Sequence, residues 1–204
     1  MADNKKHEKF IVASGGTGMR CLQAFINMCA IGVFGNEKFN ILLIDTDEEN
    51  KDKRNTEKLI DSYKFLKKRT GGEYFSADLD LYSFVPDYST DSTRDFVRLS
   101  QIELDNSDLN MRLANIFFEE EVQEFDLSHG YRAQTHLGSY LMYHAIIDEV
   151  RSAQKDSAKI ATSQLYQFIK KVVDSNSNGG RLFAFGSSFG GTGASSIPVI
   201  PRAV

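Results

Sequence analysis

The 204-residue sequence has little of several features that mark particular protein classes. It has two cysteines, Cys21 and Cys29, which would lie about 12 Å apart on one helix, beyond the reach of a disulfide. The sequence therefore indicates a reducing, cytoplasmic compartment. Basic residues (24) do not outnumber acidic ones (28), and the net charge of −4 argues against direct binding to nucleic acid. No apolar run approaches the roughly 20 residues of a membrane span, and residues 1–9 lack the apolar core of a signal peptide.

Short apolar runs alternate with helical patterns along the chain. Lys9–Ser14 and Phe39–Ile44 have the composition of buried strands, and the stretch between them places apolar residues at helical spacing. A strand, glycine turn, helix and strand in this order form a βαβ unit with parallel strands. Helical patterns at Leu137–Ala153 and Ser157–Asp174 precede a third buried-strand run, Arg181–Phe185. This order predicts an α/β fold, with a Rossmann-like, doubly wound, mostly parallel sheet.

The segment from Lys51 to Ser128 is rich in charge and only partly periodic. It contains one expected helix, Thr56–Lys68, an alternating run "DLDLYSFVP" typical of an edge strand, and a helical stretch at about 110–125. We place the segment within a single domain that covers residues 1–204.

Two glycine loops share one design: "SGGTGM" at Ser14–Met19 and "SFGGTGAS" at Ser188–Ser195. Each follows a strand run and opens a helix, where glycines expose backbone N–H groups and the helix N-terminus attracts anions. Such loops hold phosphate, and in an open α/β sheet both would border on one crevice. Neither loop has the lysine of a P-loop, and Cys21 occupies the third glycine position of a dinucleotide fingerprint.

The stretch "RLFAFGSSFGGTGASSIPVIPRA", Arg181–Ala203, resembles the glycine-rich signature of the tubulin/FtsZ superfamily. Three further stretches are similar to family segments in the same order: "IVASGGTGMRCLQAFI", "ILLIDTDEEN" and "GYRAQTHLGSY". The sequence departs from the family at Phe189 and Ser195 in the signature, and at Met19 and Arg20, where the family usually has amide side chains. Lys51–Ser128 is also much longer than the corresponding part of FtsZ, so the resemblance implies that this segment is a mainly helical insertion.

The resemblance implies a domain that binds GTP or GDP, with Mg²⁺ as a candidate companion ion. The two glycine loops would hold the phosphates and the stretch after Tyr131 would approach the γ-phosphate. Asp45, Asp47 and Glu48 form either a solvated turn or a water-mediated contact to Mg²⁺. No metal ligand and no catalytic residue is assigned. The nucleotide-binding residues expected are Gly15, Gly16, Thr17, Gly18, Arg20, Asp47, Arg132, Ala133, Gln134, Thr135, Ser188, Gly190, Gly191, Thr192, Gly193 and Ala194.

The family continues beyond this signature with a long helix that contacts the base, an acidic catalytic loop and a second domain. We therefore expect the chain to represent the nucleotide-binding part of a longer, self-associating GTPase, and to bind GTP by itself rather than hydrolyse it. Two alternatives stay open. One is an NAD(P)-binding Rossmann enzyme with Asp45 on the ribose, and the other is a tubulin-like interaction module that has lost nucleotide binding.

Overall fold

A computed structural model describes residues 8–47, 50–71, 74–86, 107–124, 127, 130–131 and 133–203. The elements of the first part are β1 (Lys9–Ser14), α1 (Gly15–Ala30), β2 (Lys38–Ile44), α2 (Lys51–Arg69), β3 (Asp78–Phe84), α3 (Ser107–Phe117) and α4 (Glu120–Gln123). They are followed by α5 (Thr135–Lys155), α6 (Ser157–Thr162), α7 (Gln164–Ser175), a short 3₁₀ turn η2 (Asn176–Asn178), β4 (Arg181–Phe185), α8 (Gly191–Ser196) and α9 (Ile200–Ala203).

The four strands form one parallel sheet in the order β3-β2-β1-β4. β1 lies inside the sheet, where Ile11 is opposite Ile41 of β2 and Phe183 of β4. The predicted α/β fold with a parallel sheet is confirmed, and the architecture is consistent with a Rossmann-like fold.

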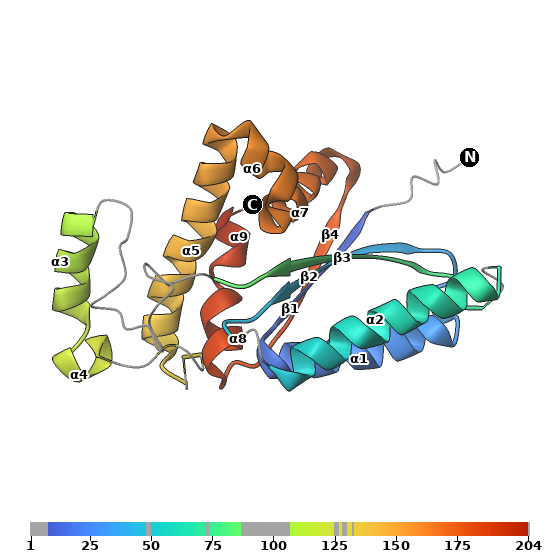
Figure 1. The fold of residues 1–204 in the computed structure, drawn as a ribbon, viewed down its shortest axis with the longest axis horizontal. Coiled ribbons are helices and arrows are strands. Elements are labelled where there is room, and N and C mark those ends of the chain that lie inside the picture. The colour runs from blue at the N-terminus through green and yellow to red at the C-terminus, as the bar shows by residue number, and fades with distance from the viewer. Residues whose placement is uncertain are drawn as a thin grey trace.

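Helices cover both faces of the sheet (Figure 1). On one face, Ile11 and Ala13 of β1 pack in a core with Leu22 and Ile26 of α1. The strand residues that alternate with these, such as Phe10, point to the other face and share a second core with α5 and α7. In this core the rings of Phe10 and Phe168 are in edge-to-face contact, with their centroids 5.7 Å apart. Because successive side chains of a strand face opposite sides, an uninterrupted apolar run suits a sheet covered on both faces.

Several boundaries differ from those expected. α1 begins at Gly15, so the first glycine loop is itself the first turn of the helix. The single helix expected at Ser157–Asp174 is divided at Ser163, whose hydroxyl accepts a hydrogen bond from the Tyr166 N–H and caps α7. β4 was expected to be buried, which is wrong: it is an edge strand, and Phe183 is 50% exposed.

The segment expected as an insertion includes parts of the main fold. Lys51–Arg69 forms α2, which packs beside α1, and Asp78–Phe84 forms β3, which pairs along its length with β2 at the sheet edge. The edge position predicted for this strand is confirmed. That the segment is an insertion stays a prediction, and residues 87–106 lie outside the described part of the chain.

The structure also bears on the two cysteines and on helices long enough to span a membrane. Both cysteines are free thiols, Cys21 exposed and Cys29 buried. No helix in the described ranges combines the length and the apolar composition that a bilayer span requires.

Candidate functional site

A polar cavity of about 220 Å³ lies at the carboxyl ends of the strands. The loops after β1, β2 and β4 border on it, together with the segment before α5. Loops at this edge of a parallel sheet lie together because every strand ends there. The lining residues are Ser14, Gly15, Gly16, Thr17, Asp45, Thr46, Asp47, Asn50, Gly130, Tyr131, Ala133, Ser187, Gly190, Gly191, Thr192 and Gly193.

The first glycine loop supplies the N-terminal turn of α1. Ser14 precedes the helix and its side chain makes no capping hydrogen bond, so the first N–H groups of α1 have no such partner. Gly15 has a φ of +66°, which favours glycine, and a Cβ here would lie 3.3 Å from the backbone nitrogen of Gly193. Glycine at this position lets the two glycine loops touch.

Hydroxyl groups join the second glycine loop to the strands beside it. The Ser14 hydroxyl donates to the Thr192 carbonyl at 3.3 Å and is also hydrogen-bonded to the Ser196 hydroxyl. The hydroxyls of Thr192 and Thr46, which follows β2, are 3.1 Å apart. Residues about 150 to 180 positions apart in the chain are thus held together at the cavity wall.

The segment before α5 forms a third wall and packs closely on α8. A Cβ at Gly191 would lie 3.0 Å from Cβ of Tyr131 and 3.1 Å from the nitrogen of Ala133, so glycine is needed for this approach. Ala133 itself has a φ of +67°. The Ser195 hydroxyl lies 2.6 Å from the Gly191 carbonyl oxygen within α8 and 3.2 Å from the Thr135 carbonyl oxygen, and the contact with Thr135 joins α8 to the start of α5.

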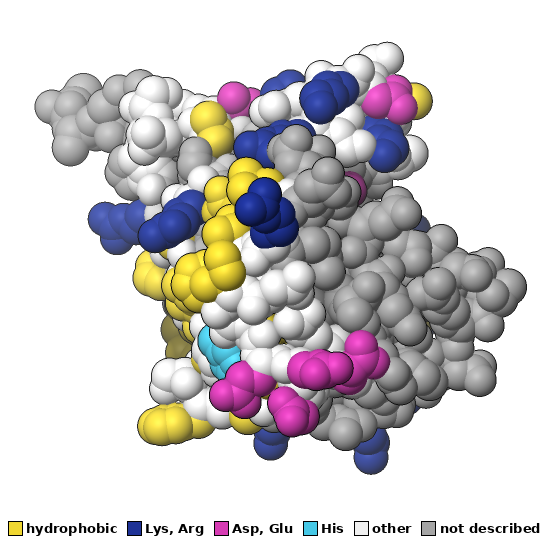
Figure 2. Space-filling view, turned by 90° about the vertical axis from the view of Figure 1, so that its left-hand side faces the viewer, with side chains coloured by type: hydrophobic (Ala, Val, Ile, Leu, Met, Phe, Trp, Pro, Cys, Tyr) yellow, Lys and Arg dark blue, Asp and Glu magenta, His cyan; other side chains and the backbone are white. Residues whose placement is uncertain are grey.

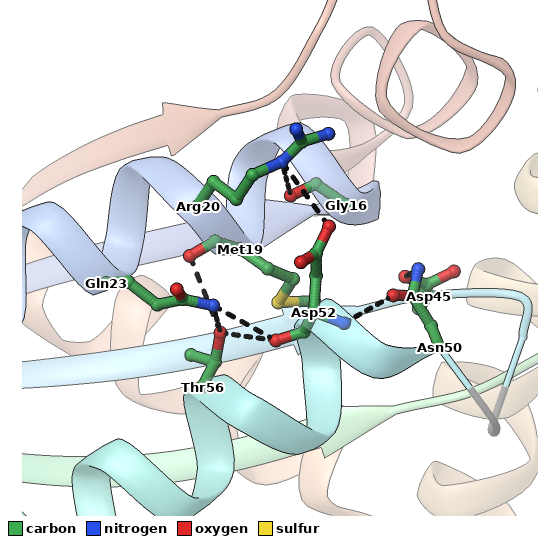
Figure 3. Close-up of polar contacts among 8 residues, drawn as sticks. All are labelled: Gly16, Met19, Arg20, Gln23, Asp45, Asn50, Asp52 and Thr56. Atoms are coloured by element: carbon green, nitrogen blue, oxygen red, sulfur yellow. Dashed lines mark hydrogen bonds and ion pairs between the residues drawn. The ribbon is translucent and has the colours of Figure 1, made fainter.

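Asp45 is a buried carboxylate on the cavity wall, 2% exposed (Figure 3). Its Oδ1 accepts from the Asp47 N–H at 3.2 Å, and its Oδ2 accepts from Nδ2 of Asn50 at 2.8 Å. Burial raises the pKa of the Asp45 carboxyl, although the backbone N–H donors oppose this change. The other end of the Asn50 amide, Oδ1, accepts from the Asp52 N–H at 2.8 Å and caps α2.

Arg20 lies at the side of the first loop and connects α1 with α2 (Figure 3). Its Nε is 3.3 Å from Oδ2 of Asp52 and donates to the Gly16 carbonyl at 3.4 Å. A Cβ at Gly16 would lie 3.0 Å from the same Asp52 oxygen. Because the Arg20 side chain is largely exposed, this ion pair contributes at most about 1 kcal/mol to stability.

The cavity brings together most of the residues expected to bind a nucleotide. Nine of them line it: Gly15, Gly16, Thr17, Asp47, Ala133, Gly190, Gly191, Thr192 and Gly193. Six described residues do not line it: Gly18, Arg20, Gln134, Thr135, Ser188 and Ala194. Arg132 lies outside the described residues, as does Glu48.

Gly18 shows why a residue of the loop can miss the cavity. A Cβ there would lie 2.4 Å from the carbonyl oxygen of Phe185, so this glycine is required for the close packing of α1 on β4. Its place in the glycine pattern reflects helix–strand packing, whereas Gly15 and Gly16 face the cavity.

Sequence reasoning missed several lining residues, among them Thr46, Asn50 and Tyr131. Thr46 and Asn50 could have been found, because they flank Asp47 in the loop after the second strand run. Tyr131 had no comparable signal, since its role depends on the approach of α8.

The electrostatic character of the wall limits what the cavity can hold. Among the described lining residues, none is basic and two, Asp45 and Asp47, are acidic. The described residues also contain no group of three or more metal-binding side chains. Backbone N–H groups, hydroxyls and the Asn50 amide are therefore the donors that the described wall can offer to an anion.

Comparison with family models, with curated proteins and with solved structures found no match to this chain.

Proposed function

We propose that this cavity binds the phosphate chain of a nucleotide, GTP or GDP, together with Mg²⁺. The observation that carries the proposal is that both glycine loops, each opening a helix, line one cavity. Neither helix has a side-chain cap at its N-terminus, so backbone N–H groups are left for an anion.

The size of the cavity indicates which part of a nucleotide it accepts. Pockets for whole drug-sized ligands are usually about 300–1,000 Å³ in volume, whereas this one is about 220 Å³. Two phosphate loops and a volume of this size suit a di- or triphosphate rather than a complete nucleotide. We therefore expect the phosphate chain to supply most of the binding free energy in this chain.

The two acidic residues explain why a divalent cation belongs in the proposal. Asp45 and Asp47 border on the space that we assign to the phosphates, and like charges at this range repel each other. Mg²⁺ binds through carboxylate and phosphate oxygens and keeps several waters, so it would remove this repulsion. Binding should consequently be much weaker without the ion.

The choice of GTP and the wider role rest on the resemblance to the tubulin/FtsZ superfamily. In such a protein the full-length chain would be a cytoskeletal or assembly GTPase that self-associates, and residues from a neighbouring subunit would complete hydrolysis. An NAD(P) site fits less well, because the Asp45 carboxylate already bonds with Asn50 and the Asp47 N–H rather than presenting its oxygens to a ribose.

Calorimetric titration of the chain with GTP, ATP, NAD and inorganic tripolyphosphate, each with and without Mg²⁺, tests the proposal. We expect GTP and tripolyphosphate to bind within about tenfold of each other, a difference of about 1.4 kcal/mol, and NAD to bind far more weakly. Tight binding of NAD with no binding of tripolyphosphate would refute a phosphate-chain site. Absence of binding by all four would favour the interaction module.

A further inference from the structure

The second glycine loop carries an aromatic side chain that no other part of the described chain covers. Phe189 is 91% exposed, the largest exposed fraction among the large hydrophobic side chains of the described residues. Exposure alone assigns no role, because single apolar side chains are common on protein surfaces. Figure 2, which views the molecule from the end that carries α3 and α4, shows hydrophobic side chains exposed on that face as well. The argument therefore depends on where Phe189 lies.

Phe189 lies at the edge of the candidate cavity. It directly precedes Gly190 and follows Ser187 by two residues, and both of these line the cavity. The Phe189 N–H donates to the Ser187 hydroxyl oxygen at 3.1 Å, which makes this part of the loop a compact turn. Of the described residues that adjoin a lining residue in the chain, Phe189 is the one with an aromatic ring. The aromatic residue of the wall itself, Tyr131, is 1% exposed and belongs to a hydrophobic core.

The size and surroundings of the cavity determine where the rest of a nucleotide can lie. A volume of about 220 Å³ suits the phosphates, so the ribose and the base must extend beyond the wall. Asp45 and Asn50, which are hydrogen-bonded to each other, line the cavity on the side of β2, and Tyr131 lines it on the side of α5. β4 is an edge strand, so no described strand lies beyond the loop that follows it. The free direction passes this loop and therefore Phe189.

We propose that the base of the bound nucleotide stacks on the ring of Phe189. This inference rests on the proposed phosphate site and deepens it by naming the side chain that contacts the base. A flat aromatic base and the Phe189 ring would both lose apolar surface to each other, and such stacking needs no hydrogen bond to the base. The sequence departs from the tubulin/FtsZ signature at Phe189, so the resemblance does not supply this contact.

Titration of Phe189→Ala with GTP and with tripolyphosphate, both in the presence of Mg²⁺, separates the base from the phosphates. We expect the affinity for GTP to fall about fivefold or more, the lower limit of what base–aromatic stacking contributes. The affinity for tripolyphosphate should change less than about twofold, because this ligand has no base. Phe117→Ala is the matched control, since Phe117 is a 69% exposed phenylalanine on α3 and does not adjoin a lining residue. It should change neither affinity.

A fluorescent reporter tests the contact directly. The chain contains no tryptophan, so Phe189→Trp introduces a single indole at the proposed position of stacking. GTP should quench its emission, because a stacked guanine quenches an excited indole, whereas tripolyphosphate should leave it nearly unchanged. Phe117→Trp should respond to neither ligand.

The outcomes distinguish this inference from the proposed function. If the wild type binds neither GTP nor tripolyphosphate, the phosphate site is refuted and the stacking contact with it. If the wild type binds both and Phe189→Ala keeps its affinity for GTP, the phosphate site remains and the stacking contact is overturned. Equal losses of affinity for the two ligands would also overturn it, because Phe189 would then support the loop rather than the base. Emission of Phe189→Trp that bound GTP does not quench would overturn it as well.

Discussion

Substitution of two adjacent glycines gives the sharpest test of the candidate site. Gly190 and Gly191 both line the cavity, but their surroundings differ. A Cβ at Gly191 would lie 3.0 Å from Cβ of Tyr131 and 3.1 Å from the nitrogen of Ala133. A Cβ at Gly190 would have its nearest neighbour, Cβ of Ser187, at 3.6 Å, an ordinary van der Waals distance. Gly191→Val should therefore disturb the site, while Gly190→Ala should be tolerated.

The expected magnitudes follow from these distances. Valine at 191 forces the segment around Tyr131 away from α8, and overpacking of this kind costs about 1–3 kcal/mol of stability. The same shift opens the cavity wall, so we expect the affinity for GTP and Mg²⁺ to fall at least tenfold, which is about 1.4 kcal/mol. For Gly190→Ala we expect a change of less than about twofold, or roughly 0.4 kcal/mol.

Calorimetric titration measures the affinities, and urea denaturation shows whether each variant is folded under the conditions used. A folded Gly191→Val protein with wild-type affinity would remove the second glycine loop from the site. Equal losses in both variants would show that the loop tolerates no side chain at all, and the argument from the Tyr131 contact would fail.

Three further expectations concern the polar groups of the cavity wall. Thr192→Val and Thr46→Val each remove one end of the same hydrogen bond, so each should lower the free energy of unfolding by about 1 kcal/mol, and the double variant should lose less than the sum in a double-mutant cycle. Asn50→Ala removes the cap of α2 and a donor to Asp45, and we expect a loss of about 2 kcal/mol in urea denaturation, against little change for the exposed Asn55→Ala. Burial raises the pKa of the Asp45 carboxyl, so the folded state keeps this proton to higher pH than the unfolded chain does. Its contribution to stability is therefore lost as pH rises above the ordinary carboxyl pKa of about 4, so the wild type should lose stability relative to Asp45→Asn as pH rises through this range. A constant difference would contradict the assignment.

The sequence predicted the fold where its pattern was local. β1 and β4 have the predicted limits, and the parallel sheet follows from the strand–helix alternation. The burial of β4 could not be predicted in the same way, because an apolar strand such as Arg181–Phe185 has the same composition whether one or two strands flank it. Position in the sheet is a tertiary property.

The candidate site was predictable in outline and not in detail. Both glycine loops were found from their composition, and the structure places them against one cavity. Which glycine faces the cavity was not predictable, because the neighbours that distinguish Gly16 from Gly18, such as Asp52 and Phe185, come from distant parts of the chain. The wall at Tyr131 depends on the approach of α5 and α8, which no local pattern records.

The pairing of β1 with β4 also has a consequence for how the protein folds. Lys9 lies beside Arg181, so the central strand waits for a partner made about 170 residues later. Pairings of such high contact order are slow to form, and until then that edge of β1 is unpaired. On the ribosome, the cavity cannot exist before β4 and α8 have been synthesised, because Thr192 and Gly193 complete its wall. A nascent chain would therefore gain its ligand-binding ability in a single step, after residue 193 has been made, and ligand could stabilise only molecules that had already closed the sheet.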